Sequence, residues 1–400
     1  MIFQIKDPIY GFIDINPKEL KLINHKIFQR LYYIKQLGFV DQLFPRAVHS
    51  RYEHSLGTMA MATYIFDFLF KEGDFENKNA YKQMRQTLRL AALLHDLGHA
   101  PFSHSLEFRM PSRFELGICK EGKANHEDYT RILIENSDIS NRIRHLFEEE
   151  GITPELIITL NFKINGITYQ PILKQIISSE CDADRMDYLQ RDSFYCGVKC
   201  IKFNIFKLLK SFIAIQNNGA IYLGIKSESV LNLKNFLLFR HYMFSNVYLH
   251  HVPVIYEEML KRLLEDCDNF FKIPTDPNDF ILFNDFNLYQ KMRFSYNSWA
   301  RRITQKKPYL LLMDKISEFS LNIISKKMAL KKINFIKTKS RNTIFKSFDS
   351  FSVPIYIQTG KGLELPLRVY TNLFNNYSTS IQFNRLYISP EDKRRAHRIS

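Results

Sequence analysis

Residues 91–107 read AALLHDLGHAPFSHSLE, and this stretch carries most of the information about the fold and its chemistry. It begins as an apolar helical segment with His95 and Asp96 at its end, followed by the helix breakers Gly98 and Pro101. A buried aspartate is costly without a partner, so Asp96 predicts a cation or a hydrogen-bond network. Imidazole and carboxylate together suit Mg, Mn, Fe or Zn with open coordination positions.

The surrounding histidines strengthen this interpretation, because a single His-Asp pair is a weak signal. Six of the twelve histidines fall between His49 and His126. His54 lies three residues after Arg51 on a predicted helix, so the two share a face. Further along, CDADRMDYLQRD (181–192) places Asp184 and Tyr188 one helical turn apart.

Apolar periodicity predicts a mainly helical chain. A short extended segment and a helix start precede the expected helices at 27–37, 50–70, 87–96, 129–149, 172–192 and 230–267. Segments 212–215 and 220–225 flank Asn217-Asn218-Gly219, the pattern of a β-hairpin. After about residue 310 we expect a basic helical run from Lys326 to Arg341. Strand-like pieces at 355–358, 365–369 and 385–388 and a solvated, partly disordered tail at 393–398 would follow.

Length and composition indicate a globular protein. Its 400 residues are 45% hydrophobic and 24% charged, and we expect a helical core over 1–310 and a smaller basic α+β region over 311–400. Five cysteines without a C-x-x-C pair favour a reducing compartment. Neither a signal peptide nor an apolar run of about 18 residues is visible, so a soluble, cytoplasmic protein without membrane contact is expected.

The formal charge of +15 permits two interpretations. A basic surface attracts nucleic acid, anionic lipid or a polyphosphate substrate. The chain is also rich in Lys, Asn, Ile, Phe and Tyr, so much of the excess lysine can reflect composition alone.

Six ordered blocks resemble one known family. They are DPIYGFI (7–13), FQRLYYIKQLG (28–38), HSRYEHSLG (49–57), residues 91–107, DADRMDYLQRDSFYCGV (182–198) and FRHYMFSNVYLH (239–250). Together they look like the HD-domain deoxynucleotide triphosphohydrolases, which include dGTPase and the SAM-and-HD-domain dNTPases. The match runs from about residue 5 to residue 265. It implies an HD-domain helical bundle with a small hairpin and a carboxy-terminal α+β appendage.

The resemblance implies that His54, His95, Asp96 and Asp184 hold one divalent metal. Mn, Fe or Mg would suit two imidazoles, two carboxylates and two open positions better than a closed zinc site, although zinc could bind in a crystal. Taken alone, Asp184 would be an ordinary helix-surface or N-cap residue.

The resemblance also implies catalytic roles. His99 would contact or protonate the substrate at the scissile phosphate with Glu107 orienting it, while His104 and His126 line the phosphate pocket. Glu107 departs from the relatives with the best-known mechanism, which carry Asp there; the longer carboxylate can still hold an imidazole, but with a different reach. His126 alternatively is a loop histidine at a helix start.

A deoxynucleoside triphosphate, with Mg on its phosphates, would be the substrate, and the products would be a deoxynucleoside and triphosphate. Arginines would donate paired hydrogen bonds to the phosphate oxygens. A tyrosine packed at C2′ would leave no room for the 2′-hydroxyl of a ribose. The implied contacts are Arg51, Arg185 and Arg240 to phosphate, Gln36, Leu37 and Asp192 to the sugar, and Tyr188 and Tyr248 on the 2′ face. Either tyrosine could instead be ordinary core.

The sequence gives less information about regulation and oligomeric state than about the site. The positions that read guanine in activated relatives hold Asn24 and Tyr32 here, and only Gln29 is kept, so guanine activation is in doubt. A homo-oligomer is expected from the resemblance. Two other functions stay open: another HD phosphatase, phosphodiesterase or nuclease, and a non-catalytic protein that binds nucleic acid through its basic carboxy-terminal region.

Overall fold

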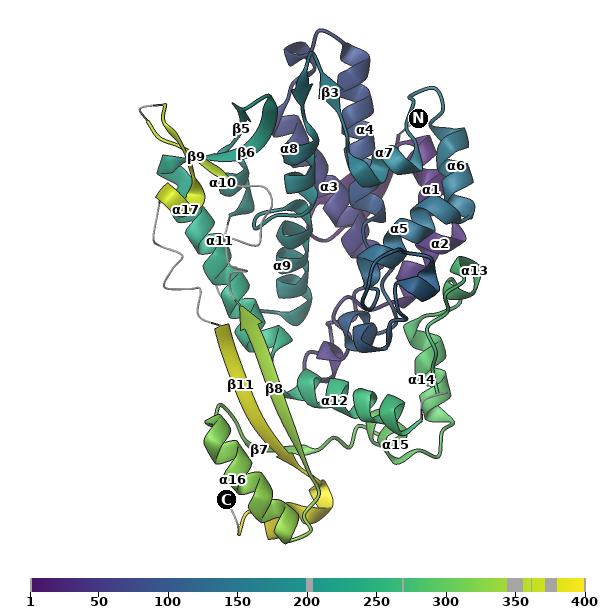
Figure 1. Cartoon of the computed structure of the whole chain (residues 1–400), viewed down its shortest axis with the longest axis vertical. Coiled ribbons are helices and arrows are strands. Elements are labelled where there is room, and N and C mark those ends of the chain that lie inside the picture. Colours follow the sequence, from purple (N-terminus) through teal and green to yellow (C-terminus); the bar gives the residue numbers. More distant parts are fainter. Residues whose placement is uncertain are drawn as a thin grey trace.

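The computed structural model describes residues 2–198, 204–267, 270–343, 355–360, 362–370 and 380–398. It is mainly α-helical, as predicted, with small sheets at the periphery (Figure 1). In the described part of the chain, no helix combines the length and the apolar character needed to cross a membrane.

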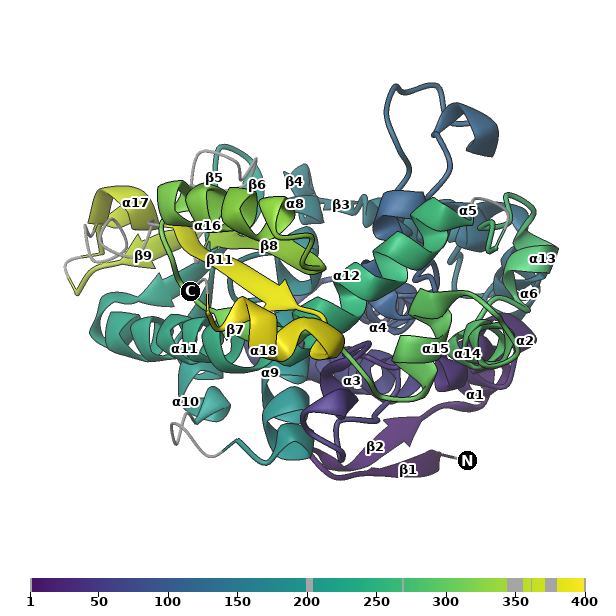
Figure 2. The same ribbon diagram turned by 90° about the horizontal axis from the view of Figure 1, so that it is seen from below.

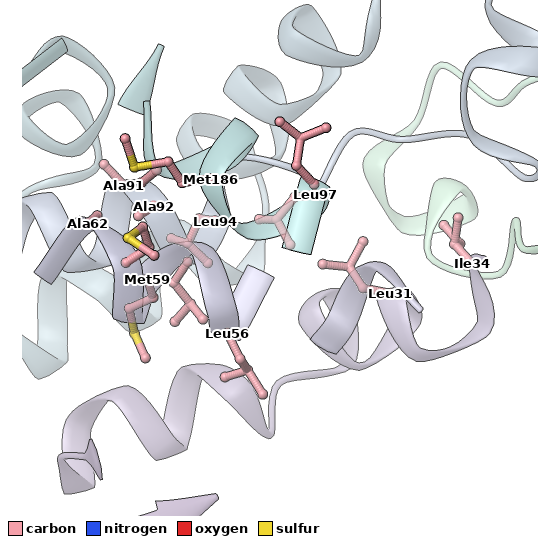
Figure 3. Packing of buried hydrophobic residues seen from close by; sticks show 14 of the residues in the cluster. Leu31, Ile34, Leu56, Met59, Ala62, Ala91, Ala92, Leu94, Leu97 and Met186 are labelled. Atoms are coloured by element: carbon pink, nitrogen blue, oxygen red, sulfur yellow. The ribbon is translucent and has the colours of Figure 1, made fainter. Parts of the chain in front are cut away.

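Three helices form the centre of the molecule: α3 (Arg51–Leu69), α4 (Lys78–Leu94) and α9 (Ala183–Cys196). Helix α3 packs against both of the others and is buried around most of its circumference. Its apolar side chains meet those of α4 and α9 in one continuous core, including Leu56, Met59, Leu94 and Met186 (Figure 3). This packing brings the His-rich ends of α3 and α4 beside the start of α9.

The remaining helices surround this centre. Their bounds are α1 (Pro17–Ile23), α2 (Lys26–Gln29), α5 (His126–Asn136), α6 (Asp138–Leu146), α7 (Pro154–Thr159), α8 (Gln170–Ile177), α10 (Ile205–Leu209), α11 (Val230–Met243), α12 (His251–Asp266), α13 (Pro277–Phe280), α14 (Asp285–Arg293), α15 (Ser298–Thr304), α16 (Glu318–Leu330), α17 (Leu367–Tyr370) and α18 (Lys393–Ala396). The short 3-10 segment η4 (Ser103–Arg109) follows α4.

Three of the predicted long helices are broken. Ser137 is extended and caps α6, which divides 129–149. Ser178 is extended and Asp182 caps α9, which divides 172–192. The segment 230–267 runs through α11 into the π-helical turn η7 (Phe244–Tyr248) and restarts at His250. Serine, aspartate and histidine side chains at these breaks accept the first free N–H groups of the next helix.

The predicted helix over 27–37 is also shorter than expected. Helix α2 gives way to a 3-10 turn, η1 (Arg30–Tyr33), and the chain is extended at Ile34. Arg30 is buried, and its guanidinium donates to the carbonyls of Leu97, His99 and Phe283. These tertiary hydrogen bonds compete with continuation of the helix, and they hold the turn that follows α4.

Within the described part of the chain, the strands form three sheets. The amino-terminal hairpin pairs β1 (Phe3–Asp7) with β2 (Gly11–Ile15) and lies along the helical body (Figure 2). The predicted hairpin is confirmed as β5 (Phe212–Asn217) and β6 (Ala220–Lys226), and β6 also pairs with β4 (Ile167–Thr168) and with β9 (Tyr356–Gln358). The remaining strands are β3 (Lys163–Ile164), β10 (Glu364–Pro366), β7 (Leu310–Met313), β8 (Phe335–Thr343) and β11 (Ser380–Ile388), with the order β7-β11-β8 in the third sheet.

The carboxy-terminal region differs from the prediction in three places. The basic helix α16 ends at Leu330, and Lys337 and Lys339 lie on β8. Residues 367–370 are helical rather than extended, since the strand ends at Pro366. Residues 393–396 form α18 instead of a disordered tail, because Ala396 is buried against Met328.

Candidate metal centre and active site

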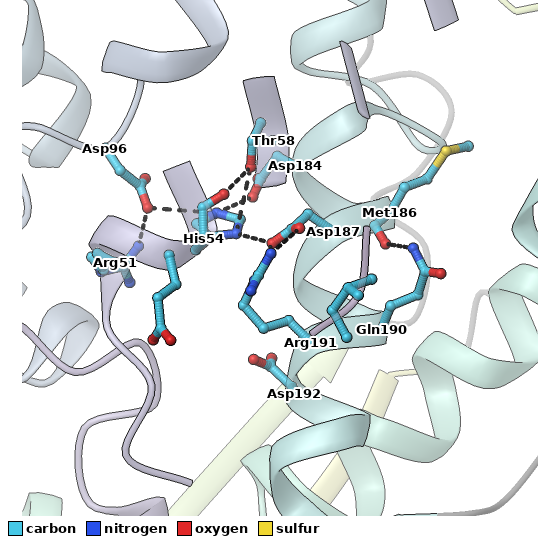
Figure 4. Close-up of polar contacts among 12 residues, drawn as sticks. Arg51, His54, Thr58, Asp96, Asp184, Met186, Asp187, Gln190, Arg191 and Asp192 are labelled. Atoms are coloured by element: carbon cyan, nitrogen blue, oxygen red, sulfur yellow. Dashed lines mark hydrogen bonds and ion pairs between the residues drawn. The ribbon is translucent and has the colours of Figure 1, made fainter. Parts of the chain in front are cut away.

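Four side chains predicted as metal ligands meet where α3, α4 and α9 converge. His54 Nε2 lies 3.0 Å from Asp184 Oδ1 and 3.6 Å from Asp96 Oδ2. His95 Nε2 lies 3.2 Å from Asp96 Oδ1 and 3.8 Å from Asp184 Oδ1. Figure 4 shows His54 between Asp96 and Asp184. The structure therefore brings together two imidazoles and two carboxylates that are distant in sequence.

The chemistry of this group fits a divalent cation. One ligand atom each from His54, His95 and Asp96 lie within 4.8 Å of one another. His95 Nδ1 donates to the Ala92 carbonyl, which leaves the buried Nε2 of the ring without a hydrogen-bond partner among the described residues. Burial alone would lower the pKa of His54, but hydrogen bonds to Asp184 and Asp187 raise it to about 10. The site thus attracts positive charge.

A buried ionic chain stands behind His54. Its Nδ1 lies 2.8 Å from Asp187 Oδ2, and Asp187 accepts two hydrogen bonds of 2.9 Å from Arg191. Arg191 also donates to Asp7, which the β1–β2 hairpin supplies. Gly57 makes this approach of α9 to α3 feasible, because a Cβ there would lie 1.9 Å from Asp187 Oδ1. An imidazole held in this way keeps its Nε2 aimed at the metal position.

Asp96 is held from the other side by Arg51. The guanidinium donates to Asp96 Oδ2 and, at 2.8 Å, to Ser103 Oγ, and both charged groups are buried. Burial alone would raise the pKa of Asp96, but Arg51 and the adjacent His95 and His99 keep it well below its ordinary value. Asp96 is therefore a carboxylate, as a metal ligand has to be.

A second polar group adjoins the first and contains the predicted catalytic residues. Glu107 Oε1 lies 2.6 Å from His126 Nδ1 and 3.0 Å from His104 Nδ1. The rings of His99 and His126 stack at 4.0 Å, and His99 Nε2 lies 3.3 Å from Asp96 Oδ1. Glu107 thus contacts His126 and His104, and in the described part of the chain it makes no direct hydrogen bond with His99, which corrects the expected pairing.

A cavity of about 240 Å³ opens beside these two groups. Six of the predicted substrate or phosphate residues line it: Gln36, Leu37, Arg51, Tyr188, Asp192 and Tyr248. His104 lines it as well, together with Gly38, Val40, Phe102, Ser103, Ser105, Phe244 and Glu257. The structure therefore gathers the predicted sugar contacts around one cavity.

Asp192 occupies one end of this cavity. Its Oδ2 accepts the Tyr248 hydroxyl at 2.6 Å, and its Oδ1 lies 2.8 Å from His49 Nε2. The rings of Tyr188 and Tyr248 meet edge-on at 6.3 Å. The two tyrosines and the aspartate form a continuous polar wall.

Two predicted phosphate-binding arginines do not line the cavity. Arg185 pairs with Asp182, and Arg240 pairs with Glu180. Both guanidinium charges are thus neutralised by carboxylates of the segment between α8 and α9.

The positions compared with the guanine-reading residues lie apart from the cavity. Gln29 donates to the Ile23 carbonyl, and Tyr32 is exposed.

Sequence reasoning missed several residues of this region, namely Asp7, His49, Ser103, Glu180, Asp187 and Glu257. The Asp187–Arg191 spacing of four residues on one helix was a usable signal. The others depend on contacts between distant segments, which periodicity does not reveal.

Comparisons with known proteins agree with this geometry. The HD domain model matches residues 51–192, and the HD associated region model matches residues 214–313. The chain therefore carries an HD domain followed by an HD associated region, and it belongs to the HD-domain superfamily of metal-dependent phosphohydrolases.

Individual relatives support the same placement. An uncharacterized protein of Methanocaldococcus jannaschii is 34% identical over 80% of this chain and 62% of its own length. The deoxynucleoside triphosphate triphosphohydrolase SAMHD1 of Homo sapiens is 29% identical over 67% of this chain and 45% of its own length. The chain thus spans less than two thirds of these curated relatives.

Solved structures share the fold across the whole chain. A hypothetical protein from Aquifex aeolicus has a TM-score of 0.79 and 26% identity, and the similarity covers 100% of this chain and 99% of that one. A phosphohydrolase from Bacteroides thetaiotaomicron has a TM-score of 0.73 at 22% identity, covering 97% and 100%, which is a likeness of fold alone.

Proposed function

We propose that the protein hydrolyses deoxynucleoside triphosphates to a deoxynucleoside and inorganic triphosphate, with one divalent metal at the HD site. The observation that carries this proposal is the cavity in which Tyr188, Tyr248 and Asp192 adjoin Arg51 and the metal-ligand group. A phosphatase that recognises only the phosphate group would not need Tyr188, Tyr248 and Asp192 arranged to contact a sugar. The similarity to SAMHD1, a deoxynucleoside triphosphate triphosphohydrolase, supports the same substrate class.

The phosphate end of the substrate would lie at His54, His95, Asp96 and Asp184. When bound there, a divalent ion such as Mn, Fe or Mg supplies a water of lowered pKa and polarises a phosphoryl oxygen. Arg51 is already oriented by Ser103 and Asp96, so its remaining donors serve as a fixed positive charge beside the phosphates. Arg185 and Arg240 stay predicted phosphate contacts, and each would have to turn from its present carboxylate partner.

The leaving oxygen needs a proton. Glu107 accepts from His126 Nδ1, which fixes the ring and leaves Nε2 to carry the transferable proton. His99 stacks on this ring and reaches toward Asp96, so it lies between the proton donor and the metal ligands. We assign proton delivery to the His99–His126 pair, with Glu107 positioning His126 and His104 completing the pocket.

The sugar end would lie against Gln36, Leu37, Asp192 and the two tyrosines. Asp192 already accepts from Tyr248 and retains lone pairs for a 3′-hydroxyl. The ring edges of Tyr188 and Tyr248 close the wall where a ribose 2′-hydroxyl would project. The exclusion of ribonucleotides follows from this placement.

Product analysis tests the proposal. Purified protein is incubated with each dNTP and rNTP in Mg or Mn, and the products are separated by chromatography, with Asp96→Ala as the inactive control. Deoxynucleoside and triphosphate from dNTPs alone are expected. Mono- or diphosphate products, or equal turnover of rNTPs, would refute the proposed reaction.

A second candidate is an HD phosphodiesterase or nuclease, and one observation favours it. A groove that shares His104, Ser105 and Glu257 with the cavity is also lined by Lys261, Lys337 and Lys339. Such lysines suit a nucleic-acid backbone. Cleavage of single-stranded DNA or RNA, lost in Asp96→Ala and steeply weakened by salt, would favour this function over the first.

A further inference from the structure

Glu257 is an acidic residue of the cavity with no role in the chemistry described above. It lies on α12 and lines the cavity on the side formed by Gly38, Val40 and Ser105. Its carboxylate accepts one hydrogen bond, from Ser105 Oγ at 3.2 Å. Among the described residues, no cation pairs with it and no second hydrogen bond reaches it.

An unpaired acid is unfavourable in a cavity meant for an anionic substrate. Burial raises the pKa of Glu257 to about 7, because Ser105 alone compensates its charge. A carboxylate has about four lone-pair sites that accept hydrogen bonds. Ser105 occupies one of those of Glu257, so the others remain free. Hydrogen-bond donors on a ligand would satisfy these sites and offset the cost of burial.

The position of Glu257 indicates which part of a ligand it meets. Under the proposed function, on which this inference rests, the phosphates lie at the metal ligands and the sugar lies against Asp192 and Tyr248. The lining residues assigned to neither end are Gly38, Val40, Phe102, Ser103, Ser105, Phe244 and Glu257. Apolar surface with one polar acceptor is the environment of a nucleobase ring with a hydrogen-bonding edge.

We propose that Glu257 is a base-specificity residue that accepts hydrogen bonds from N1–H and N2–H of guanine. Guanine alone among the four DNA bases presents two adjacent N–H donors on one edge, which match the two oxygens of a carboxylate. Thymine presents one N–H between two carbonyl oxygens that repel a carboxylate. Adenine and cytosine each set an amino group beside a ring acceptor, which also faces the carboxylate unfavourably.

Replacing Glu257 by glutamine tests the assignment, because the preference between guanine and adenine should reverse rather than disappear. The amide offers one acceptor and one donor, which complements the amino group and adjacent ring nitrogen of adenine but no longer matches the N1–H and N2–H donor pair of guanine. Glu257→Gln keeps the shape of the side chain and removes a poorly compensated charge, so the fold should be retained. Glu258→Gln is the matched control, because Glu258 is adjacent on α12, pairs with Arg262 and does not line the cavity.

The measurement is isothermal titration calorimetry of deoxyguanosine and deoxyadenosine with the full chain, which needs no turnover. We expect the unmodified protein and Glu258→Gln to bind deoxyguanosine more tightly. Glu257→Gln should change the ratio of the two dissociation constants by roughly tenfold or more toward deoxyadenosine. Equal affinities, an unchanged ratio in Glu257→Gln, or no binding of either nucleoside would overturn the assignment.

The same proteins are then assayed for dNTP hydrolysis, so that the two proposals fail separately. If the nucleoside ratio reverses but no dNTP is turned over, the assignment of Glu257 stands and the proposed reaction is wrong. If dNTPs are hydrolysed with the same base order in all three proteins, the reaction stands and the assignment of Glu257 is wrong.

Discussion

At the scale of single residues, the proposed metal ligands depend on the charged side chains that lie behind them. Asp187 contacts His54, and Arg191 bridges Asp187 to Asp7. These groups are buried, so removal of any one leaves a charge without its partner. The chain of contacts couples the orientation of one imidazole to the amino-terminal hairpin.

This coupling predicts a contrast between two variants. Asp187→Asn and Asp7→Asn each remove one carboxylate from Arg191, and each should lower the free energy of unfolding by about 3 kcal/mol or more. Asp187→Asn alone frees the ring of His54, so it should weaken metal binding roughly 10- to 100-fold. Metal retained after dialysis against a chelator, read by atomic spectrometry on both folded variants, measures the difference. Equal metal affinities would show that Asp187 only stabilises the fold.

Glu257 predicts a pH effect on stability. Its folded pKa of about 7 lies above the ordinary 4.5, so the folded protein holds this proton more tightly than the unfolded chain. The stabilisation is complete below about pH 4.5 and is lost as the pH rises through 7, on the order of 3 kcal/mol. Urea unfolding of the protein and of Glu257→Gln between pH 5 and 8 measures it. The variant should gain stability relative to the parent as pH rises, and parallel curves would contradict this.

At the scale of secondary-structure elements, close packing of α3 and α9 positions the site. Gly57 lies at their contact, where a Cβ would approach Arg191 Nη2 to 2.3 Å as well as Asp187. A second close approach occurs at Gly98, where a Cβ would lie 2.1 Å from the His126 carbonyl oxygen. Glycine is thus required where α9 packs against α3 and where the turn after α4 packs against the start of α5.

Gly57→Ala should therefore destabilise the protein by about 3 kcal/mol or more, since overpacking outweighs the gain of about 1 kcal/mol that alanine gives in a helix. Thermal unfolding followed by circular dichroism measures this loss. Gly73→Ala is the control, because a Cβ at Gly73 meets no atom within 4 Å. Similar melting temperatures for the two variants would refute the close-packing argument.

At the scale of the whole molecule, the positive charge is concentrated in the carboxy-terminal region, whereas the hydrophobic core is shared between that region and the rest of the chain. Residues 311–400 contain sixteen Lys and Arg against six Asp and Glu, so most of the net charge lies there. The apolar side chains of this region nevertheless join the main core. Ile357 and Tyr387 are fully buried in it, and the Tyr387 hydroxyl donates to the His251 carbonyl. Homo-oligomer formation stays a prediction.

The shared core predicts the outcome of truncation. A chain that ends at Tyr309 loses β9 from the β6 edge and uncovers apolar surface on α12. It should be insoluble or melt at a much lower temperature than the full chain. Size-exclusion chromatography and calorimetry measure this. A soluble truncated protein with an unchanged melting temperature would favour residues 311–400 as an independent appendage.

The sequence by itself determined the elements whose signals are local. The capped helix over 51–69, the Asn-Gly hairpin and the His95-Asp96 helix end follow from periodicity and turn chemistry within a few residues. The ordered motifs also predicted which side chains would gather at the site, since His54, His95, Asp96 and Asp184 do meet.

Only the tertiary structure decided how those side chains are held. Periodicity predicted long helices at 129–149, 172–192 and 230–267, but side-chain caps and packing broke each of them. The pairing of Asp187 with His54, of Glu180 with Arg240 and of Glu107 with His126 was likewise not visible in the sequence. The physical reason is that a charged side chain selects its partner after distant helices have packed, when burial makes each unpaired charge costly.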